Sequence, residues 1–152
     1  MNTLKIQTEL LKAWADEATR PKCKCAPEPG YGEQSPRVAV TFDGITAHIL
    51  QRDDCIIDLG KLGAPMPLLW KLMENLDGYA LLEPTGVEVV RDKNGRAVEY
   101  NGACGKVYLA AKYLARFDKG AQFYARSATN AVIATEEGEV VGLIMPTRPD
   151  VK

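Results

Sequence analysis

Turn-forming pairs between short apolar runs constrain the fold of this chain more than any other feature. Asp43-Gly44 separates RVAVTF from ITAHIL, Asn94-Gly95 interrupts GVEVVRDKNGRAVEY, and EEGE at residues 136–139 precedes VVGLIM. Asp-Gly and Asn-Gly pairs favour the tight turns that join antiparallel neighbours. The sequence therefore predicts hairpins of antiparallel strands.

Residues 1–62 predict a strand, a helix and three further strands. The first strand is LKIQ at residues 4–7, and the helix follows it with Thr8 as its N-terminal cap and Pro21 beyond its end. The stretch 21–36 is rich in Pro and Gly and predicts a long loop, which is either mobile or functional. RVAVTF, ITAHIL and CIIDL then predict a three-strand meander.

The same order of elements returns after an insert. Residues 63–102 predict a helix, with Pro67 in its first turn and Gly78 at its end, and then a hairpin. Residues 103–148 predict the strand KVYL, the helix AAKYLARFDKG and the strands AQFYAR, NAVIAT and VVGLIM. The repeat is one of element order, not of residue identity. We predict one α+β domain, residues 1–152, with two β-α-β-β-β units and an inserted helix and hairpin.

Length and charge narrow the class of protein. The chain has 152 residues, of which 46% are hydrophobic, enough to bury a core. Its net charge of −1 gives no overall field that would attract nucleic acid, so a DNA contact needs a local basic patch. The N-terminus does not look like a signal peptide, and no apolar run approaches the roughly 20 residues of a membrane span. We expect a soluble, cytoplasmic protein.

The four cysteines leave two interpretations open. Cys23 and Cys25 form a C-x-C pair, which is not a standard zinc spacing. Together with Cys104 and His48 they would make a zinc site. Alternatively, Cys23 and Cys25 are loop thiols, Cys55 is a core thiol and Cys104 is a turn thiol. We expect no bound metal and no disulfide.

Catalytic residues are scarce in the sequence. The only histidine, His48, alternates with Ala47 and Ile49 and is expected to be a surface or half-buried strand residue. Asp53 and Asp54 are adjacent turn residues whose carboxylates point apart. No nucleophile elbow, phosphate-binding loop or glycine fingerprint is present. We therefore predict a protein that is not an enzyme and carries no cofactor.

Three stretches resemble the bacterial sliding clamp family, the β subunit of DNA polymerase III. They are the ending IMPTR at residues 144–148, the stretch VYLAAKYLARF with its pair Lys112-Tyr113, and the opening LKIQTELLKAW. The resemblance implies a DNA-clamp-like fold and a non-enzymatic role in DNA replication. In that family the Met-Pro end lines an apolar groove for short peptides of replication proteins.

Carried over to this chain, the groove wall comprises Met145, Pro146, Thr147 and Arg148. The alternative is that a core strand simply ends there and Pro146, which has no N–H, marks its exit. The chain also departs from the family, because Thr147 stands where clamps usually have Met and residues 63–102 have no counterpart. Clamp protomers have three domains, so a ring of this chain would be a homo-oligomer of about six copies. A single-domain version would suit a phage or other mobile element.

A clamp also needs a basic face towards double-stranded DNA. Lys112, Arg116 and Lys119 are spaced to share one side of the predicted second helix, and Lys12 and Arg20 add charge at the first. The alternative is an ordinary solvated helix surface. Two functions therefore stay open: a clamp-like DNA replication accessory, and a regulatory protein-protein interaction module that keeps the fold without encircling DNA.

Overall fold

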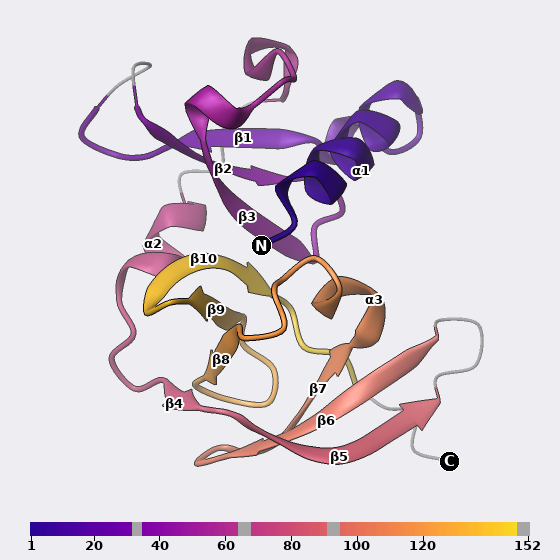
Figure 1. Cartoon of the computed structure of the whole chain (residues 1–152), viewed down its shortest axis with the longest axis vertical. Coiled ribbons are helices and arrows are strands. Elements are labelled where there is room, and N and C mark those ends of the chain that lie inside the picture. The colour runs from indigo at the N-terminus through magenta and orange to yellow at the C-terminus, as the bar shows by residue number, and fades with distance from the viewer. Residues whose placement is uncertain (32–34, 64–67, 91–94, 149–152) are drawn as a thin grey trace.

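Two antiparallel sheets form the framework of the protein. The computed structural model describes residues 1–31, 35–63, 68–90 and 95–148 (Figure 1). The larger sheet contains β1 (Lys24–Pro27), β2 (Arg37–Thr41), β3 (Thr46–Gln51), β4 (Ala80–Leu81), β8 (Gln122–Ala125), β9 (Val132–Glu136) and β10 (Glu139–Ile144). Its strand order is β1-β2-β3-β10-β9-β8-β4. The smaller sheet contains β5 (Glu83–Val90), β6 (Arg96–Gly102) and β7 (Gly105–Ala110), in that order.

Three α-helices and three short 3-10 turns complete the described part of the chain. The helices are α1 (Thr3–Ala15), α2 (Leu68–Glu74) and α3 (Ala111–Leu114), and the turns are η1 (Arg20–Lys22), η3 (Arg52–Asp54) and η4 (Leu59–Lys61). The protein is thus of mixed α+β class, as the sequence predicts. None of the helices among these residues is long and apolar enough to cross a membrane.

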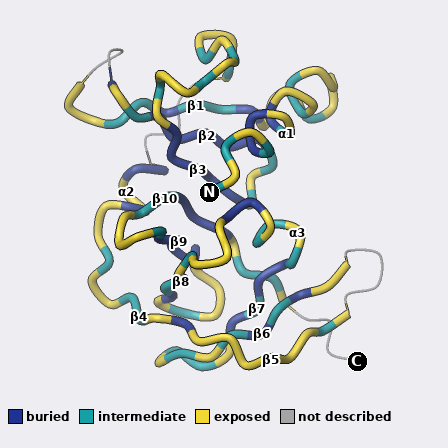
Figure 2. Tube along the Cα trace, viewed as in Figure 1, coloured by how far each residue is buried: buried dark blue, intermediate teal, exposed yellow. Residues whose placement is uncertain are grey.

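The helices divide between the two faces of the larger sheet. Val38 of β2 packs in one cluster with Leu10 of α1, whereas its neighbour Ala39 packs with Trp70 of α2. Successive side chains of a strand point to opposite faces, so α1 and α2 cover opposite sides of the sheet. Strands β2, β3 and β9 are consequently buried for most of their length, and β10 is buried over its second half (Figure 2).

The α3 segment covers the same face as α1. Phe117, just after α3, packs with Ile144 of β10 and Val132 of β9, and it also stacks against His48 of β3. The α1 and α3 segments therefore lie on the same face of the larger sheet. Each is followed by three antiparallel strands, and the two sets of strands meet where β3 pairs with β10.

The N-terminal segment is helical where a strand was predicted. α1 begins at Thr3, because the side chain of Asn2 accepts a hydrogen bond from the backbone N–H of Lys5 at 3.1 Å and caps the helix. Thr8 is not a cap: it lies within the helix and its hydroxyl donates to the carbonyl of Leu4. The first unit therefore runs helix–strand–strand–strand and lacks the opening strand of the predicted order.

Two further predictions for the first unit are wrong. The predicted loop 21–36 contains the end of η1 and all of β1, and β1 pairs along its length with β2. Conversely, CIIDL is not a strand, and Ile56 within it is 78% exposed. The meander still has three strands, but its third member lies before RVAVTF and not after ITAHIL.

The second unit follows the predicted order, with a shorter helix. β7, α3, β8, β9 and β10 occur in sequence, and the turn between β9 and β10 places Glu137 and Gly138 at positive φ. α3 ends at Leu114, so the residues up to Gly120 do not continue it.

The predicted insert is not a separate appendage, because β4 pairs with β8 and β6 pairs with β7. Pro67 and Asn94 lie outside the described residues.

Candidate functional site

The chain changes sheets immediately after β10. The N–H of Met145 donates to the carbonyl of Ile45 at 2.8 Å, and the N–H of Thr147 donates to the carbonyl of Tyr108 in β7 at 2.8 Å. Pro146 stands between these two bonds. Its missing N–H therefore costs no hydrogen bond, and the Met-Pro step serves as the crossing between the sheets.

Two hollows flank this crossing and share Ile45 and Met145. The first, of about 390 Å³, is lined mainly by apolar residues of α2, β3 and β10: Leu69, Leu72, Ala47 and Leu143. The second, of about 380 Å³, is lined by Ala110, Lys112, Tyr113, Pro146 and Thr147. We call these two hollows together the Met145 groove. Met145, 37% exposed, is part of the wall of both.

The charged residues among the described lining of the Met145 groove are all basic. Lys22 and Lys24 line the first hollow and Lys112 lines the second, whereas the described residues that line the two hollows include no Asp or Glu. The ammonium of Lys112 lies 4.9 Å from the centre of the Tyr113 ring. Arg148 is exposed and lines neither hollow. Among its described residues, the groove therefore combines a mainly apolar first hollow, a mixed second hollow and three lysines.

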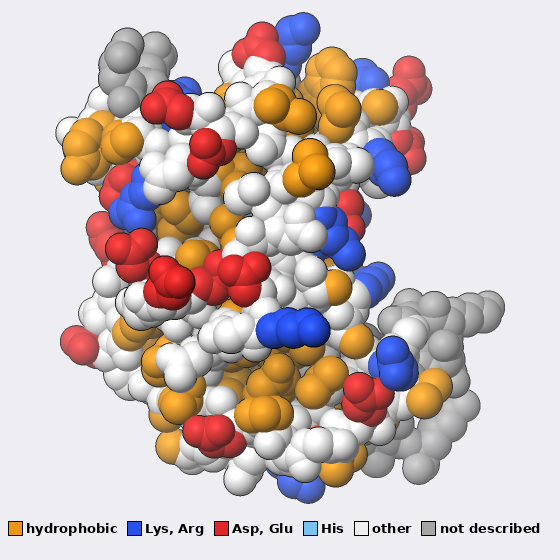
Figure 3. Space-filling model, viewed as in Figure 1, with side chains coloured by type: hydrophobic (Ala, Val, Ile, Leu, Met, Phe, Trp, Pro, Cys, Tyr) orange, Lys and Arg blue, Asp and Glu red, His pale blue; other side chains and the backbone are white. Residues whose placement is uncertain are grey.

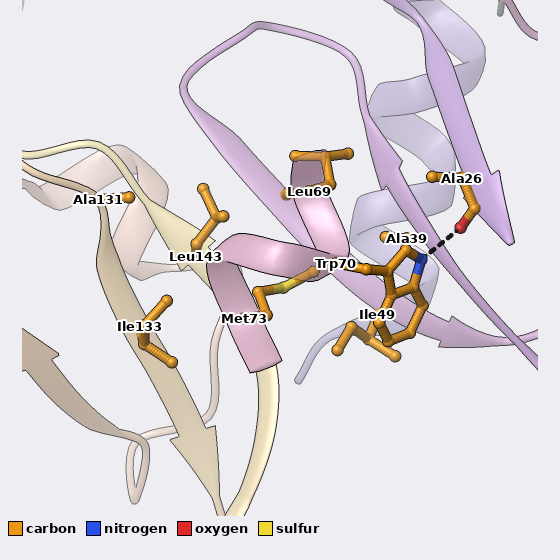
Figure 4. Close-up of a cluster of buried hydrophobic side chains, with 10 residues drawn as sticks. Ala26, Ala39, Ile49, Leu69, Trp70, Met73, Ala131, Ile133 and Leu143 are labelled. Atoms are coloured by element: carbon orange, nitrogen blue, oxygen red, sulfur yellow. Dashed lines mark hydrogen bonds between the residues drawn. The ribbon is translucent and has the colours of Figure 1, made fainter. Parts of the chain in front are cut away.

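Helix α2 forms one wall of the groove and is held by Trp70. The indole N–H of Trp70 donates to the carbonyl of Ala26 in β1 at 2.8 Å (Figure 4). Trp70 and Met73 pack against Ile49 on the sheet, and this leaves Leu69 and Leu72 beside the groove. The sequence indicated an apolar stripe in this helix but contained no signal for what the helix packs against.

Arg116 occupies a buried position that the sequence did not predict. Its guanidinium donates to Glu9 of α1, to Asp43 of the β2–β3 turn and to the hydroxyl of Thr46, each at 2.6 Å. It also lies over the Phe42 ring at 4.6 Å. The prediction that Arg116 belongs to a solvent-facing basic row is wrong, because the helix ends before it and the chain turns its side chain inwards.

The same network determines the ionisation of Asp43. Burial alone would raise the pKa of this carboxyl, but the N–H groups of Thr46 and Ile45 and the Arg116 guanidinium outweigh it, so the pKa is lowered. Asp43 is thus a stable anion that closes the turn and fixes Arg116. Arg116 in turn links α1, the first hairpin and the α3 segment.

The remaining predicted DNA-contacting residues do not form one row. Lys112 and Lys119 are exposed, and so is Lys12 on α1. Arg20 donates to the carbonyl of Trp14 at 2.6 Å and lies over its ring, so it caps the end of α1. Because Arg116 is buried, Lys112 and Lys119 are the members of the predicted three-residue row that remain at the surface. The acidic Asp118 is the sequence neighbour of Lys119.

His48 is fully buried, contrary to the expected surface or half-buried position. It lies between the rings of Phe42 and Phe117, and its Nε2 is 3.0 Å from the hydroxyl of Thr46. Alternation along β3 was predicted correctly, but the face that carries His48 is covered by the α1 and α3 segments. Burial and the positive charge of Arg116 lower the pKa of His48 to about 3.

His48 is expected to stay neutral throughout the physiological range. Its ring ¹⁵N and ¹³C chemical shifts in the folded protein should not change between about pH 5 and pH 8, because protonation would place a second cation beside Arg116. The same residue in urea should titrate near about 6.5, which is the built-in control. A midpoint within the physiological range in the folded state would contradict the buried geometry.

The cysteines do not gather at one place. Cys23 is buried with Cys25 and Cys55 at the edge of its cluster, while Cys104 packs in a different cluster with Tyr100. Among the described residues no group of three or more His, Cys, Asp or Glu side chains is arranged to hold a metal ion. The zinc interpretation therefore lacks the convergence of Cys23, Cys25 and Cys104 that it requires.

The fold and groove define a mixed α+β protein of mostly antiparallel sheets with an apolar, cation-edged groove. Comparison of the chain with protein-family models, with curated proteins and with solved structures found no match in any of the three.

Proposed function

We propose that the protein is a non-enzymatic interaction module that binds a short acidic, partly apolar segment of a partner protein in the Met145 groove. The observation that carries this proposal is the pair of hollows sharing Ile45 and Met145, whose described lining residues include three lysines and no acid. Apolar anchors of a peptide would fill the two hollows. Acidic residues beside those anchors would face the lysines.

The chemistry of the groove suits a linear peptide. Methionine is flexible and polarisable, so a partly exposed Met145 can adapt to different apolar anchors. Peptides that dock in such grooves gain most of their affinity from a few buried anchors, and charges at the rim favour one class of partner. Leu69 and Leu72 on α2 face the anchor in the first hollow, and Tyr113 faces the anchor in the second.

This proposal corresponds to the interaction module that keeps a clamp-like fold without encircling DNA. Support for the clamp-like fold comes from the helix and three strands that occur twice on one sheet. Further support is the groove at the Met-Pro end, where the family resemblance implies one. The role of a DNA-encircling replication accessory has weaker support, because buried Arg116 cannot contact a phosphate.

Selection from a phage-displayed library of random twelve-residue peptides tests the function. We expect enrichment of peptides with two large apolar residues close together and Asp or Glu beside them. The variant Met145→Glu should bind the selected peptides at least about 30-fold more weakly, the effect of losing a central anchor contact. Fluorescence anisotropy of labelled peptides at two salt concentrations measures both the affinity and the contribution of the lysines.

Val87→Glu is the matched control for this substitution. Val87 is 47% exposed on edge strand β5 and lines neither hollow, so its replacement should leave peptide affinity unchanged. Selection of basic peptides, or equal binding by Met145→Glu, would refute the proposal. Retention of the protein on closed circular duplex, lost in the Lys112→Ala, Lys119→Ala double variant, would instead favour the DNA function.

A further inference from the structure

A larger hollow, separate from the Met145 groove, lies between the two sheets. Its volume is about 700 Å³, and none of the described residues that line it also lines the groove. Residues of β4, β5, β6 and the α3–β8 segment surround it. In Figure 3 it is the hollowed apolar area below the middle of the molecule, with a basic side chain along its upper rim.

Aromatic rings form the deep part of the hollow. Phe117 and Phe123 meet edge to face with centroids 5.8 Å apart, and Tyr100 meets Phe123 in the same way at 5.8 Å. Phe117 and Phe123 are buried, and Leu82 lies beside them. Such rings offer both faces and edges to a bound ring system.

Small residues keep the hollow open. Ala111, Ala115 and Ala121 line it on the side of the α3 segment, where larger apolar side chains would fill the space. Leu81 is 38% exposed at its edge. Apolar surface exposed to water is unfavourable in free energy, and a ligand that covers this surface removes it from water. The volume also falls within the roughly 300–1,000 Å³ of small-molecule sites.

The charges around the hollow nearly cancel. Lys119, Glu83 and Asp118 are the charged residues among the described ones that line it. The amino group of Met1 pairs with the carboxylate of Asp118 at 2.6 Å and also with that of Glu136, so one negative charge remains in excess. The side-chain amide of Gln122 can bond a polar edge of a ligand. The lining therefore does not attract an anion, and its single excess charge gives a cation little attraction.

We propose that this hollow binds a small aromatic compound of no net charge, with a ring system the size of indole or purine. The aromatic floor packs against the ring, the alanines leave room for it, and Gln122 or Lys119 bonds its polar edge. The site is independent of the proposed peptide function, because no residue in the described part of the chain lines both surfaces.

Indole is the probe for this site, with benzoate and benzylamine as charged comparators. Titration followed by NMR should shift signals of Tyr100, Phe117 and Phe123, and indole should bind at least about tenfold more tightly than either ion. Ala115→Trp should weaken indole binding by about tenfold or more, because the new side chain occupies the hollow. Ala115 is exposed and has helical φ and ψ, which accept Trp without strain.

Ala128→Trp is the control, since Ala128 is exposed and does not line the hollow. Met145→Glu should also leave indole binding intact, which separates this site from the groove. If Ala115→Trp fails to fold, Ala121→Leu tests the same filling of the hollow. Absence of shifts at millimolar indole, equal affinity in the filled variant, or tighter binding of either ion would overturn the proposal.

Discussion

Replacing Arg116 with Met is expected to lower the free energy of unfolding by about 3–5 kcal/mol. The substitution keeps most of the side-chain volume but leaves the carboxylates of Glu9 and Asp43 without their shared cation. An uncompensated charge in a buried site is far more costly than a lost surface ion pair. Urea-induced unfolding followed by far-UV circular dichroism measures the change.

Arg126→Met is the matched control, because Arg126 is exposed and should change stability by no more than about 0.5 kcal/mol. The pH dependence supplies a second check. Asp43 has a folded pKa below its ordinary 3.8, so its contribution is present above that value and is lost as pH falls through the folded pKa. The difference between wild type and Arg116→Met should therefore shrink in acid. A loss of less than about 1 kcal/mol at neutral pH would argue that the network is solvated.

Replacing Trp70 with Ala is expected to cost about 3–5 kcal/mol of stability. Trp70 is 6% exposed and joins α2 to the sheet through packing and through its bond to the carbonyl of Ala26. A cavity under a seven-residue helix removes most of what holds that helix in place. Because Leu69 and Leu72 reach the Met145 groove from α2, peptide binding should weaken even where the variant still folds.

Trp70→Phe separates packing from hydrogen bonding. It retains an aromatic ring but removes the indole N–H that bonds the Ala26 carbonyl, so we expect a loss of about 1–3 kcal/mol, less than for Ala. A Trp14→Phe background isolates the fluorescence of Trp70, which should be blue-shifted in the folded state and shift to the red on unfolding. Emission typical of exposed indole in the folded protein would contradict the placement of α2.

Local features of the fold were predictable from sequence. The β2–β3 turn forms because Asp43 accepts hydrogen bonds from the N–H groups of Ile45 and Thr46 and Gly44 takes a positive φ. The β9–β10 turn has Glu137 and Gly138 at positive φ as well. Such turns depend on two to four adjacent residues, so their chemistry is visible in the sequence. The end of the last strand at Met145-Pro146 was also predictable from adjacent residues, because Pro146 has no N–H to donate.

Short apolar runs were assigned less well, because their conformation depends on distant partners. LKIQ lies in a helix because Asn2 caps it and because Ile6 and Leu10, one turn apart, share a buried cluster. CIIDL has the composition of a strand but no neighbouring strand to pair with. The stretch at β1 resembles a loop in composition, yet it pairs with β2. Four-residue runs carry too little periodicity to decide such cases.

The sequence by itself determined the turns, the mixed α+β class and the position of Met145 and Pro146, because adjacent residues carry that information. Only the tertiary structure decided which polar side chains are buried and which surfaces face each other. Arg116 meets Glu9 and Asp43 across 107 and 73 residues of chain. The opposite wall of the groove comes from α2 and Ile45. These contacts depend on how the sheets and helices pack, and packing is a property of the whole chain.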